Sequence, residues 1–155
     1  MALHLLGAIN MIEALDLEVN GSCFLDEQKK SLLMIEDDLS LIELLDIVID
    51  EINPGLDWEY VTTGEEALKV IERRAQIRGA PYTLVLADIF LAGELTGFDV
   101  WLFCQRKFPQ MPFVFTSSLS ADRFLSIISG LSQCPEYIQK PLTVSHCMNL
   151  IRSYF

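Results

Sequence analysis

From residue 31 onward, short apolar runs alternate with segments of helical periodicity, and this alternation restricts the fold more than any other feature of the sequence. The central apolar run, residues 82–88, is rich in Leu and Val and ends on the carboxylate of Asp88. An apolar run of this kind is typical of a strand that is buried on both faces of a parallel sheet. Asp88 is therefore predicted at the carboxyl end of a core strand, where open α/β sheets bind their ligands.

Four further runs are predicted as strands, and each of the five strands is followed by a predicted helix. The other strands cover residues 31–35, 58–61, 113–115 and 136–139, and the helices cover about 41–52, 64–78, 98–108, 121–129 and 143–154. Thr63 and Glu66 are expected to form a capping box at the start of the second helix. Strict alternation of strand and helix predicts the α/β class, with a doubly wound, five-stranded parallel sheet and helices on both faces.

The composition fits one globular domain that is preceded by a distinct N-terminal segment. Of the 155 residues, 51% are hydrophobic and 21% are charged, a balance that allows a buried core. We expect an extension or linker over residues 1–30 and a folded domain over residues 31–155. The extension carries only a ragged helical stripe. It is either a leader without fixed contacts or an amphipathic helix that packs on its own domain or on a second copy, as in a homodimer.

The net charge of −11 excludes several classes of function. Duplex-binding surfaces need clustered Lys and Arg, and the eleven in this chain are scattered, so no direct nucleic-acid partner is expected. No apolar stretch reaches the roughly 18 residues that span a bilayer, so no membrane partner is expected. No two of the four cysteines have the Cys-x-x-Cys spacing. We interpret them as reduced thiols of a cytoplasmic protein.

Polar side chains cluster where the predicted strands end. Glu36 and Asp37 follow the first strand, Asp88 ends the third, Ser117 follows the fourth and Lys140 follows the fifth. In a parallel sheet these ends lie on one edge, so we expect the five side chains to converge. Three close carboxylates need a cation, and Mg²⁺ prefers such hard oxygen ligands. With a lysine opposite, the site predicts phosphoryl transfer to an aspartate nucleophile.

Four segments at these strand ends match a known family in residues and spacing. They are 33–38 (Leu-Met-Ile-Glu-Asp-Asp), 84–88 (Leu-Val-Leu-Ala-Asp), 113–117 (Phe-Val-Phe-Thr-Ser) and 137–141 (Tyr-Ile-Gln-Lys-Pro). From residue 31 to its last residue the chain resembles the receiver domain of two-component response regulators. The resemblance implies the flavodoxin-like strand order 2-1-3-4-5. It also implies a single-domain phosphoacceptor signalling protein, which is not an enzyme but takes part in its own phosphotransfer and dephosphorylation.

The resemblance assigns a role to each of the three acidic residues at the strand ends. Glu36 and Asp37 would hold Mg²⁺ together with Asp88 and the backbone carbonyl of Phe90. Asp88 would accept the phosphoryl group from a histidine kinase or a histidine phosphotransfer protein. An unknown downstream protein would then read a phosphorylation-driven change of the surface.

Three further positions take roles from the same resemblance. Lys140 would contact the phosphoryl group, and its peptide bond to Pro141 is expected to be cis. Ser117 would be the switch hydroxyl, with the neighbouring Thr116 as the alternative. Tyr137 would be the switch aromatic residue, which repacks inward after phosphorylation.

Two other classes of function stay open. The first is a receiver-fold scaffold or dimerisation module that accepts no phosphate, against which the retained acidic residues and lysine argue. The second is a metal-dependent phosphatase with an aspartyl nucleophile. Such enzymes usually carry a second acid two residues after the nucleophile, and that position is Phe90 here. We interpret Phe90 and Leu119 as apolar residues that hinder water attack on a phosphoryl group at Asp88.

Overall fold

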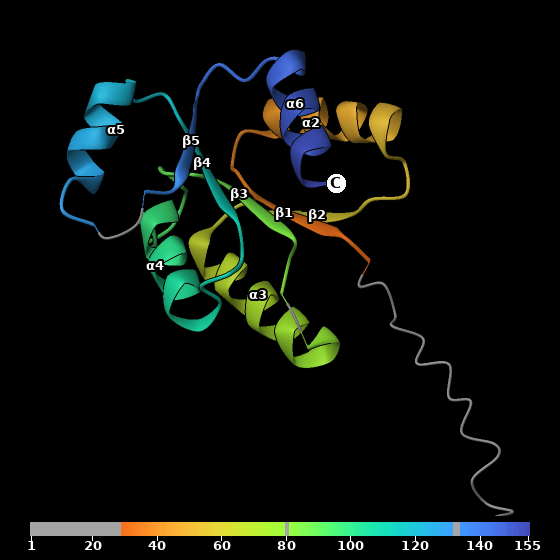
Figure 1. Ribbon diagram of the computed structural model, residues 1–155, viewed down its shortest axis with the longest axis horizontal. Helices are drawn as coiled ribbons and strands as arrows, with labels where there is room; N and C mark the ends of the chain where they lie inside the picture. Colours follow the sequence, from red (N-terminus) through yellow and green to blue (C-terminus); the bar gives the residue numbers. More distant parts are fainter. Residues whose placement is uncertain (1–28, 80, 132–133) are drawn as a thin grey trace, which may run out of the picture.

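The computed structural model describes residues 29–79, 81–131 and 134–155, and within them five parallel strands form one sheet (Figure 1). The strands are β1 (Ser31–Ile35), β2 (Asp57–Val61), β3 (Leu84–Asp88), β4 (Phe113–Ser117) and β5 (Glu136–Gln139). Their order is β2-β1-β3-β4-β5. The predicted α/β class and the strand order 2-1-3-4-5 are therefore confirmed.

Helices cover both faces of this sheet (Figure 1). They are α2 (Leu39–Ile52), α3 (Gly64–Arg78), α4 (Gly97–Lys107), α5 (Ala121–Ile128) and α6 (Val144–Tyr154). One core cluster joins α2 and α6 to one face, and the other joins α3, α4 and α5 to the opposite face. Each helix runs back against the strand direction, so its last turn lies near the amino edge of the sheet.

Side-chain alternation along the central strands explains why they are apolar throughout. In β3, Val85 and Ala87 face the α3–α4–α5 layer, and Leu84 and Leu86 face the α2–α6 layer. Every residue of β1, β3 and β4 is buried. A strand buried on both faces can carry a polar residue without cost only at its end, and Asp88 lies at such an end.

The helix starts follow the capping residues that the sequence contains. Asp38 caps α2, accepting a hydrogen bond of 3.0 Å from Ser40 N. Thr63 caps α3 as predicted, but Glu66 accepts from the N–H of Thr62 rather than from that of Thr63. The reciprocal half of the predicted capping box is therefore wrong by one residue.

Two expectations about the chain outside the sheet have different outcomes. The bond between Lys140 and Pro141 is cis, as expected. The predicted N-terminal extension falls almost entirely in residues 1–28, which lie outside the described residues. Among the described helices, none has both the length and the apolar character that crossing a bilayer requires.

Candidate functional site

Three carboxylates meet at the carboxyl edge of the sheet. Glu36 follows β1 and is 1% exposed, Asp88 ends β3 and is 8% exposed, and Asp37 is exposed beside them. One oxygen from each of the three lies within 4.8 Å of the others. The convergence that the sequence predicts is therefore present, because the register of β1 against β3 places their ends side by side.

Lys140 joins two of these carboxylates from the end of β5. Its Nζ donates to Asp88 Oδ2 at 2.5 Å and to Glu36 Oε1 at 2.9 Å. Glu36 Oε2 is also 2.8 Å from Nζ, but without hydrogen-bond geometry, so this buried oxygen has no hydrogen-bond partner among the described residues. One ammonium group thus faces two buried carboxylates and leaves acceptor capacity unused.

Burial and charge oppose each other in this cluster. Burial raises the pKa of the Glu36 carboxyl, Lys140 lowers it and the charge of Asp88 raises it again, with a raised pKa as the net result. Burial lowers the pKa of Lys140, but its hydrogen bonds to Asp88 and Glu36 outweigh burial and leave that pKa raised. Lys140 is therefore protonated at neutral pH, and the local charge stays negative.

The donor set at this edge fits a small divalent cation. Three carboxylates supply hard oxygen ligands, and Glu36 Oε2 is buried without a hydrogen bond. Asp37 is exposed, so solvent can complete the coordination shell of an ion such as Mg²⁺, which keeps several waters. The cluster therefore suits Mg²⁺ better than a metal that prefers nitrogen or sulfur ligands.

The backbone after β3 holds Asp88 in place. Asp88 Oδ1 accepts a hydrogen bond of 3.1 Å from the N–H of Phe90, whose side chain is 55% exposed. The start of α4 passes so close to this strand end that a Cβ at Gly97 would lie 2.1 Å from the carbonyl oxygen of Asp88. Only glycine fits at this position, and the close approach fixes the loop beside the carboxylate.

Glu65 anchors the loop that follows β3, a role that the sequence reasoning missed. Its Oε1 accepts hydrogen bonds of 2.9 Å from the N–H groups of both Glu94 and Leu95. Hydrogen bonds from backbone N–H groups lower the pKa of this carboxyl. The N–H of Glu65 itself has the largest effect, followed by those of Leu95 and Glu94. The anchor ties the start of α3 to the loop over residues 91–97, which joins β3 to α4.

Of the predicted switch residues, Ser117 and Tyr137 lie on the α3–α4–α5 side of β4 and β5, the face of Phe115, whereas Thr116 lies on the α2–α6 side, the face of Val114. Ser117 and Thr116 are both buried, and they are the last two residues of β4, which is two residues longer than predicted. The Tyr137 ring stacks on Phe124, with 4.2 Å between ring centroids. The Tyr137 hydroxyl donates to the carbonyls of Ser117, at 3.1 Å, and of Leu119. Tyr137 thus already occupies the inward position.

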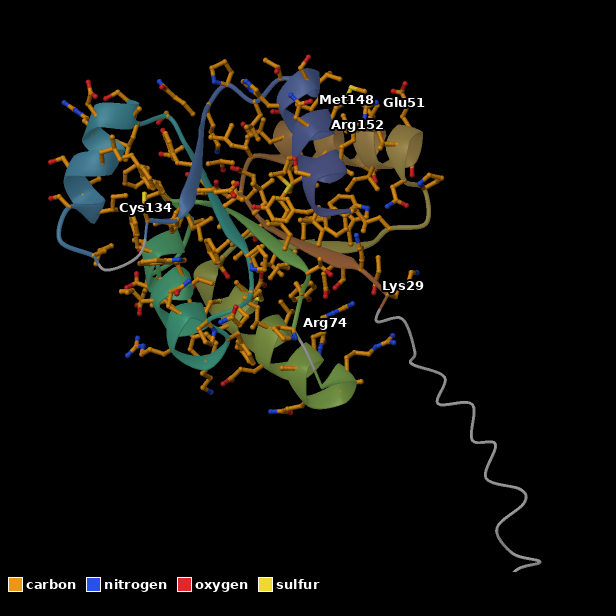
Figure 2. The ribbon with its side chains drawn as sticks, viewed as in Figure 1. Lys29, Glu51, Arg74, Cys134, Met148 and Arg152 are labelled. Atoms are coloured by element: carbon orange, nitrogen blue, oxygen red, sulfur yellow. The ribbon has the colours of Figure 1, made fainter. Side chains whose placement is uncertain are left out.

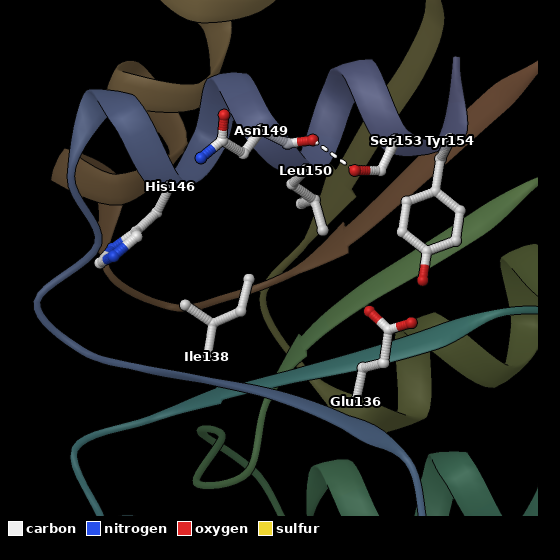
Figure 3. A pocket seen from close by; sticks show the side chains of 7 residues that line it. All are labelled: Glu136, Ile138, His146, Asn149, Leu150, Ser153 and Tyr154. Atoms are coloured by element: carbon white, nitrogen blue, oxygen red, sulfur yellow. Dashed lines mark hydrogen bonds between the residues drawn. The ribbon is translucent and has the colours of Figure 1, made fainter.

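A hollow of about 460 Å³ lies between β5 and α6, and the side chains that line it differ in chemistry from the acidic cluster (Figure 3). The Tyr154 hydroxyl points toward the Glu136 carboxylate, and burial together with Glu136 raises the pKa of Tyr154 to about 12. The Nδ1 atom of His146 accepts from the N–H of Thr143 in the cap of α6, so this histidine has a structural role. The hollow holds a single carboxylate, unlike the three of the acidic cluster.

Comparison with known proteins gives a result at the level of the fold. No family model matches the sequence, and no curated protein matches it. Solved structures do match. The signal receiver domain of a putative LuxO repressor protein from Vibrio parahaemolyticus has a TM-score of 0.65 and 20% identity, over 81% of this chain and 89% of that one. This chain has the receiver-domain fold.

Two further structures agree with this result. A CheY-like response regulator receiver domain protein from Methanospirillum hungatei JF-1 has a TM-score of 0.63 and 21% identity, over 80% of this chain and 91% of its own. The phosphorylated cyanobacterial phytochrome response regulator RcpA has a TM-score of 0.63 and 19% identity, over 80% of this chain and 89% of its own. The receiver resemblance seen in the sequence is therefore confirmed as a likeness of fold.

Proposed function

We propose that this receiver domain acts as a response regulator that accepts a phosphoryl group on Asp88 from a histidine kinase or a histidine phosphotransfer protein. The observation that carries the proposal is the carboxyl-edge cluster, in which Glu36, Asp37 and Asp88 lie together and one lysine contacts two of them. In a scaffold, two buried carboxylates that share one ammonium group would only cost stability, because their charge is incompletely neutralised. Incomplete pairing of this kind is typical of a site that binds a charged ligand.

The chain's own residues suit each part of the transfer. A carboxylate oxygen of Asp88 forms a bond to phosphorus while the bond from phosphorus to the donor nitrogen or oxygen breaks, and the donor leaves with that electron pair. Lys140 lies 2.5 Å from Asp88 and can pair with the charge on the phosphoryl oxygens. Glu36, Asp37, Asp88 and the Phe90 carbonyl are the proposed ligands of Mg²⁺, which would neutralise phosphoryl charge when bound.

The proposed signal is a shift between two arrangements of Ser117 and Tyr137. Both hydrogen bonds of the Tyr137 hydroxyl go to the β4–α5 segment, at Ser117 and Leu119. A phosphoryl group on Asp88 would draw the Ser117 hydroxyl toward it, and the segment that holds Tyr137 would move with it. Because Tyr137 is already inward, phosphorylation would stabilise an existing arrangement rather than create it. A downstream protein would read the surface formed by α5 and β5, while Thr116 remains the alternative hydroxyl.

Exposure to a small phosphodonor tests this proposal. Purified protein is incubated with acetyl phosphate and Mg²⁺, and its intact mass is measured by mass spectrometry. The expected result is the gain of one phosphoryl group, which disappears in Asp88→Asn and when EDTA removes the metal. No gain under any condition would support the scaffold function. Steady turnover of a generic phosphate ester would support the phosphatase function instead.

A further inference from the structure

An apolar groove of about 400 Å³ crosses the amino edge of the sheet, on the opposite side of the domain from the acidic cluster. It is formed by the ends of α3 and α4 and by the segments that lead into β3 and β4. Its apolar lining residues are Pro81, Tyr82, Phe108, Pro109, Met111 and Pro112. A second groove of about 420 Å³ shares residues 109–112 and continues toward β5. The second groove has a more polar lining, so the apolar surface is that of the first groove, whose volume lies within the range of binding sites.

The N-terminal segment leaves the described domain beside this groove. Ser31 begins β1, and its N–H donates to Thr83 Oγ1 at 3.0 Å while its carbonyl accepts from Thr83 N at 2.8 Å. Thr83 is itself one of the residues that line the groove. A linker of about ten residues can extend over roughly 30 Å, which is the width of a small domain. An apolar stretch earlier in the segment can therefore reach any part of the groove.

The charges of the segment and of the groove rim are complementary. Residues 1–28 contain five carboxylates and neither Lys nor Arg. Exposed cations flank the groove, with Arg78 at the end of α3 and Arg106 and Lys107 at the end of α4. Lys29 and Arg74 lie at the same edge (Figure 2). Arg74 pairs with Asp57 and Lys107 with Glu72, so Arg78 and Arg106 are the flanking arginines that have no ion pair among the described residues. An acidic, apolar segment matches this rim better than it matches the carboxyl edge, where the carboxylates of the cluster would repel it.

We propose that residues 3–19 of the same chain dock in the amino-edge groove. Their Leu and Ile side chains would cover the apolar lining, and Glu13, Asp16 and Glu18 would face Arg78 and the end of α4. Docking at this edge leaves the acidic cluster open to a phosphodonor. The proposal therefore stands whether or not Asp88 accepts a phosphoryl group.

A spin label in the groove of the full chain tests this contact. Cys23 and Cys134 are replaced by Ser, because Cys104 and Cys147 are buried and do not react, and a nitroxide is attached at Gln110→Cys. The matched control carries the nitroxide at Ser118→Cys, an exposed position beyond the carboxyl end of β4. In ¹⁵N-labelled protein, the amide signals of residues 3–19 are expected to lose most of their intensity with the groove label and to keep it with the control label. Equal intensities with both labels would overturn the proposal.

Two additional arms identify the occupant. Protein at natural ¹⁴N abundance that carries the groove nitroxide is mixed with ¹⁵N-labelled protein that carries no nitroxide. The amide intensities of the ¹⁵N-labelled protein are expected to stay unchanged, because docking occurs within one chain. Intensity loss in this mixture that matches the loss within one chain would overturn the proposal in favour of a second copy. The variant Arg106→Glu with Lys107→Glu is expected to restore intensity to residues 3–19 in the groove-labelled protein. Loss of intensity that is insensitive to this charge reversal would contradict the proposed pairing.

Discussion

The two edges of the sheet treat charge in opposite ways. At the amino edge, Arg74 donates to Asp57 at 2.7 Å and to the carbonyl of Pro81 at 3.2 Å, and Tyr82 donates to Glu59. These groups are buried or partly buried, and each polar group has a partner. At the carboxyl edge, buried carboxylates outnumber the single lysine that contacts them. The same topology thus closes one edge with satisfied ion pairs and leaves buried carboxylate charge incompletely neutralised at the other edge. The incompletely neutralised edge is the one suited to bind a charged group.

Removal of the lysine at the carboxyl edge should give the largest effect. Lys140→Met removes the ammonium group that contacts Asp88, so the rate of phosphorylation by acetyl phosphate at saturating Mg²⁺ should fall by roughly 10²–10³. Lys107→Met is the matched control, because Lys107 is exposed at the amino-edge end of α4 and pairs with Glu72. Its rate should stay at the wild-type value. Intact mass against time measures both rates, and circular dichroism verifies folding. Equal rates in the two variants would show that the lysine at the carboxyl edge has no special role in phosphorylation.

A smaller effect is expected when one carboxylate of the cluster is neutralised. Glu36→Gln should weaken Mg²⁺ binding by about 10–100-fold, measured by titration calorimetry. It should also raise the free energy of unfolding at pH 7 in the absence of metal by about 1 kcal/mol, because a buried charge is removed. Glu59→Gln, at the amino edge, should leave Mg²⁺ affinity unchanged.

The pH dependence of the same variant follows from the raised pKa of Glu36. A carboxyl whose folded-state pKa is raised contributes stability that is fully present below its unfolded value of 4.5 and is lost as the pH rises through the folded value. The stability difference between Glu36→Gln and wild type should therefore be largest at pH 7, shrink as the pH falls from the raised folded value toward 4.5, and stay constant below 4.5. Urea unfolding across this range measures it. A difference that grows toward acid would contradict the assignment of Glu36 as a destabilising charge.

The apolar residues beside Asp88 should control the lifetime of the phosphoryl group rather than its arrival. Replacing Phe90 and Leu119 together by Asn should shorten the half-life about tenfold, which corresponds to a barrier lowered by about 1.4 kcal/mol, since water would gain access. Ile77→Asn is the control, because Ile77 is 72% exposed near the amino edge. Decay of the phosphorylated mass after removal of the donor gives the half-life. An unchanged half-life in the double variant would show that these side chains do not exclude water.

The amino-edge ion pairs should affect stability alone. Arg74→Met removes the hydrogen bonds to Asp57 and Pro81 and should lower the free energy of unfolding by about 1–2 kcal/mol. The phosphorylation rate should remain that of the wild type, because the change lies at the opposite edge. Lys69→Met, at an exposed position of the same helix, should change neither quantity. A lower phosphorylation rate in Arg74→Met would mean that the two edges are coupled.

Much of the fold and of the acidic cluster follows from local pattern and from the geometry of parallel sheets. The run at residues 84–88 reads as a core strand because both its faces are apolar, and its end must then lie beside the ends of β1 and β4. This arrangement of strand ends is sufficient to predict that Glu36, Asp88 and Lys140 lie close together. The lysine-to-carboxylate contacts confirm the convergence, while the chemical roles of these residues stay predictions.

Features that depend on contacts between distant segments could not be predicted. The sequence pattern predicts an end of β4 two residues too early, at Phe115. Ladder hydrogen bonds to β3 and β5 keep Thr116 and Ser117 in the strand and buried, although both are polar. Glu65 reads as an ordinary acidic residue of a helix start, and its bonds to a loop about thirty residues later have no local signal. The inward Tyr137 depends in the same way on packing against Phe124.

Locating the phosphoryl group tests the central claim most directly. Wild-type protein is phosphorylated with acetyl phosphate and Mg²⁺ and then reduced with borohydride, which converts an aspartyl phosphate to homoserine. Peptide mass spectrometry reads the modified position. If Asp88 is the phosphoacceptor, homoserine appears at residue 88, and Glu36 and Asp37 are unmodified. Reduction at another carboxylate, or an unmodified residue 88 in protein that has gained a phosphoryl group, would contradict it.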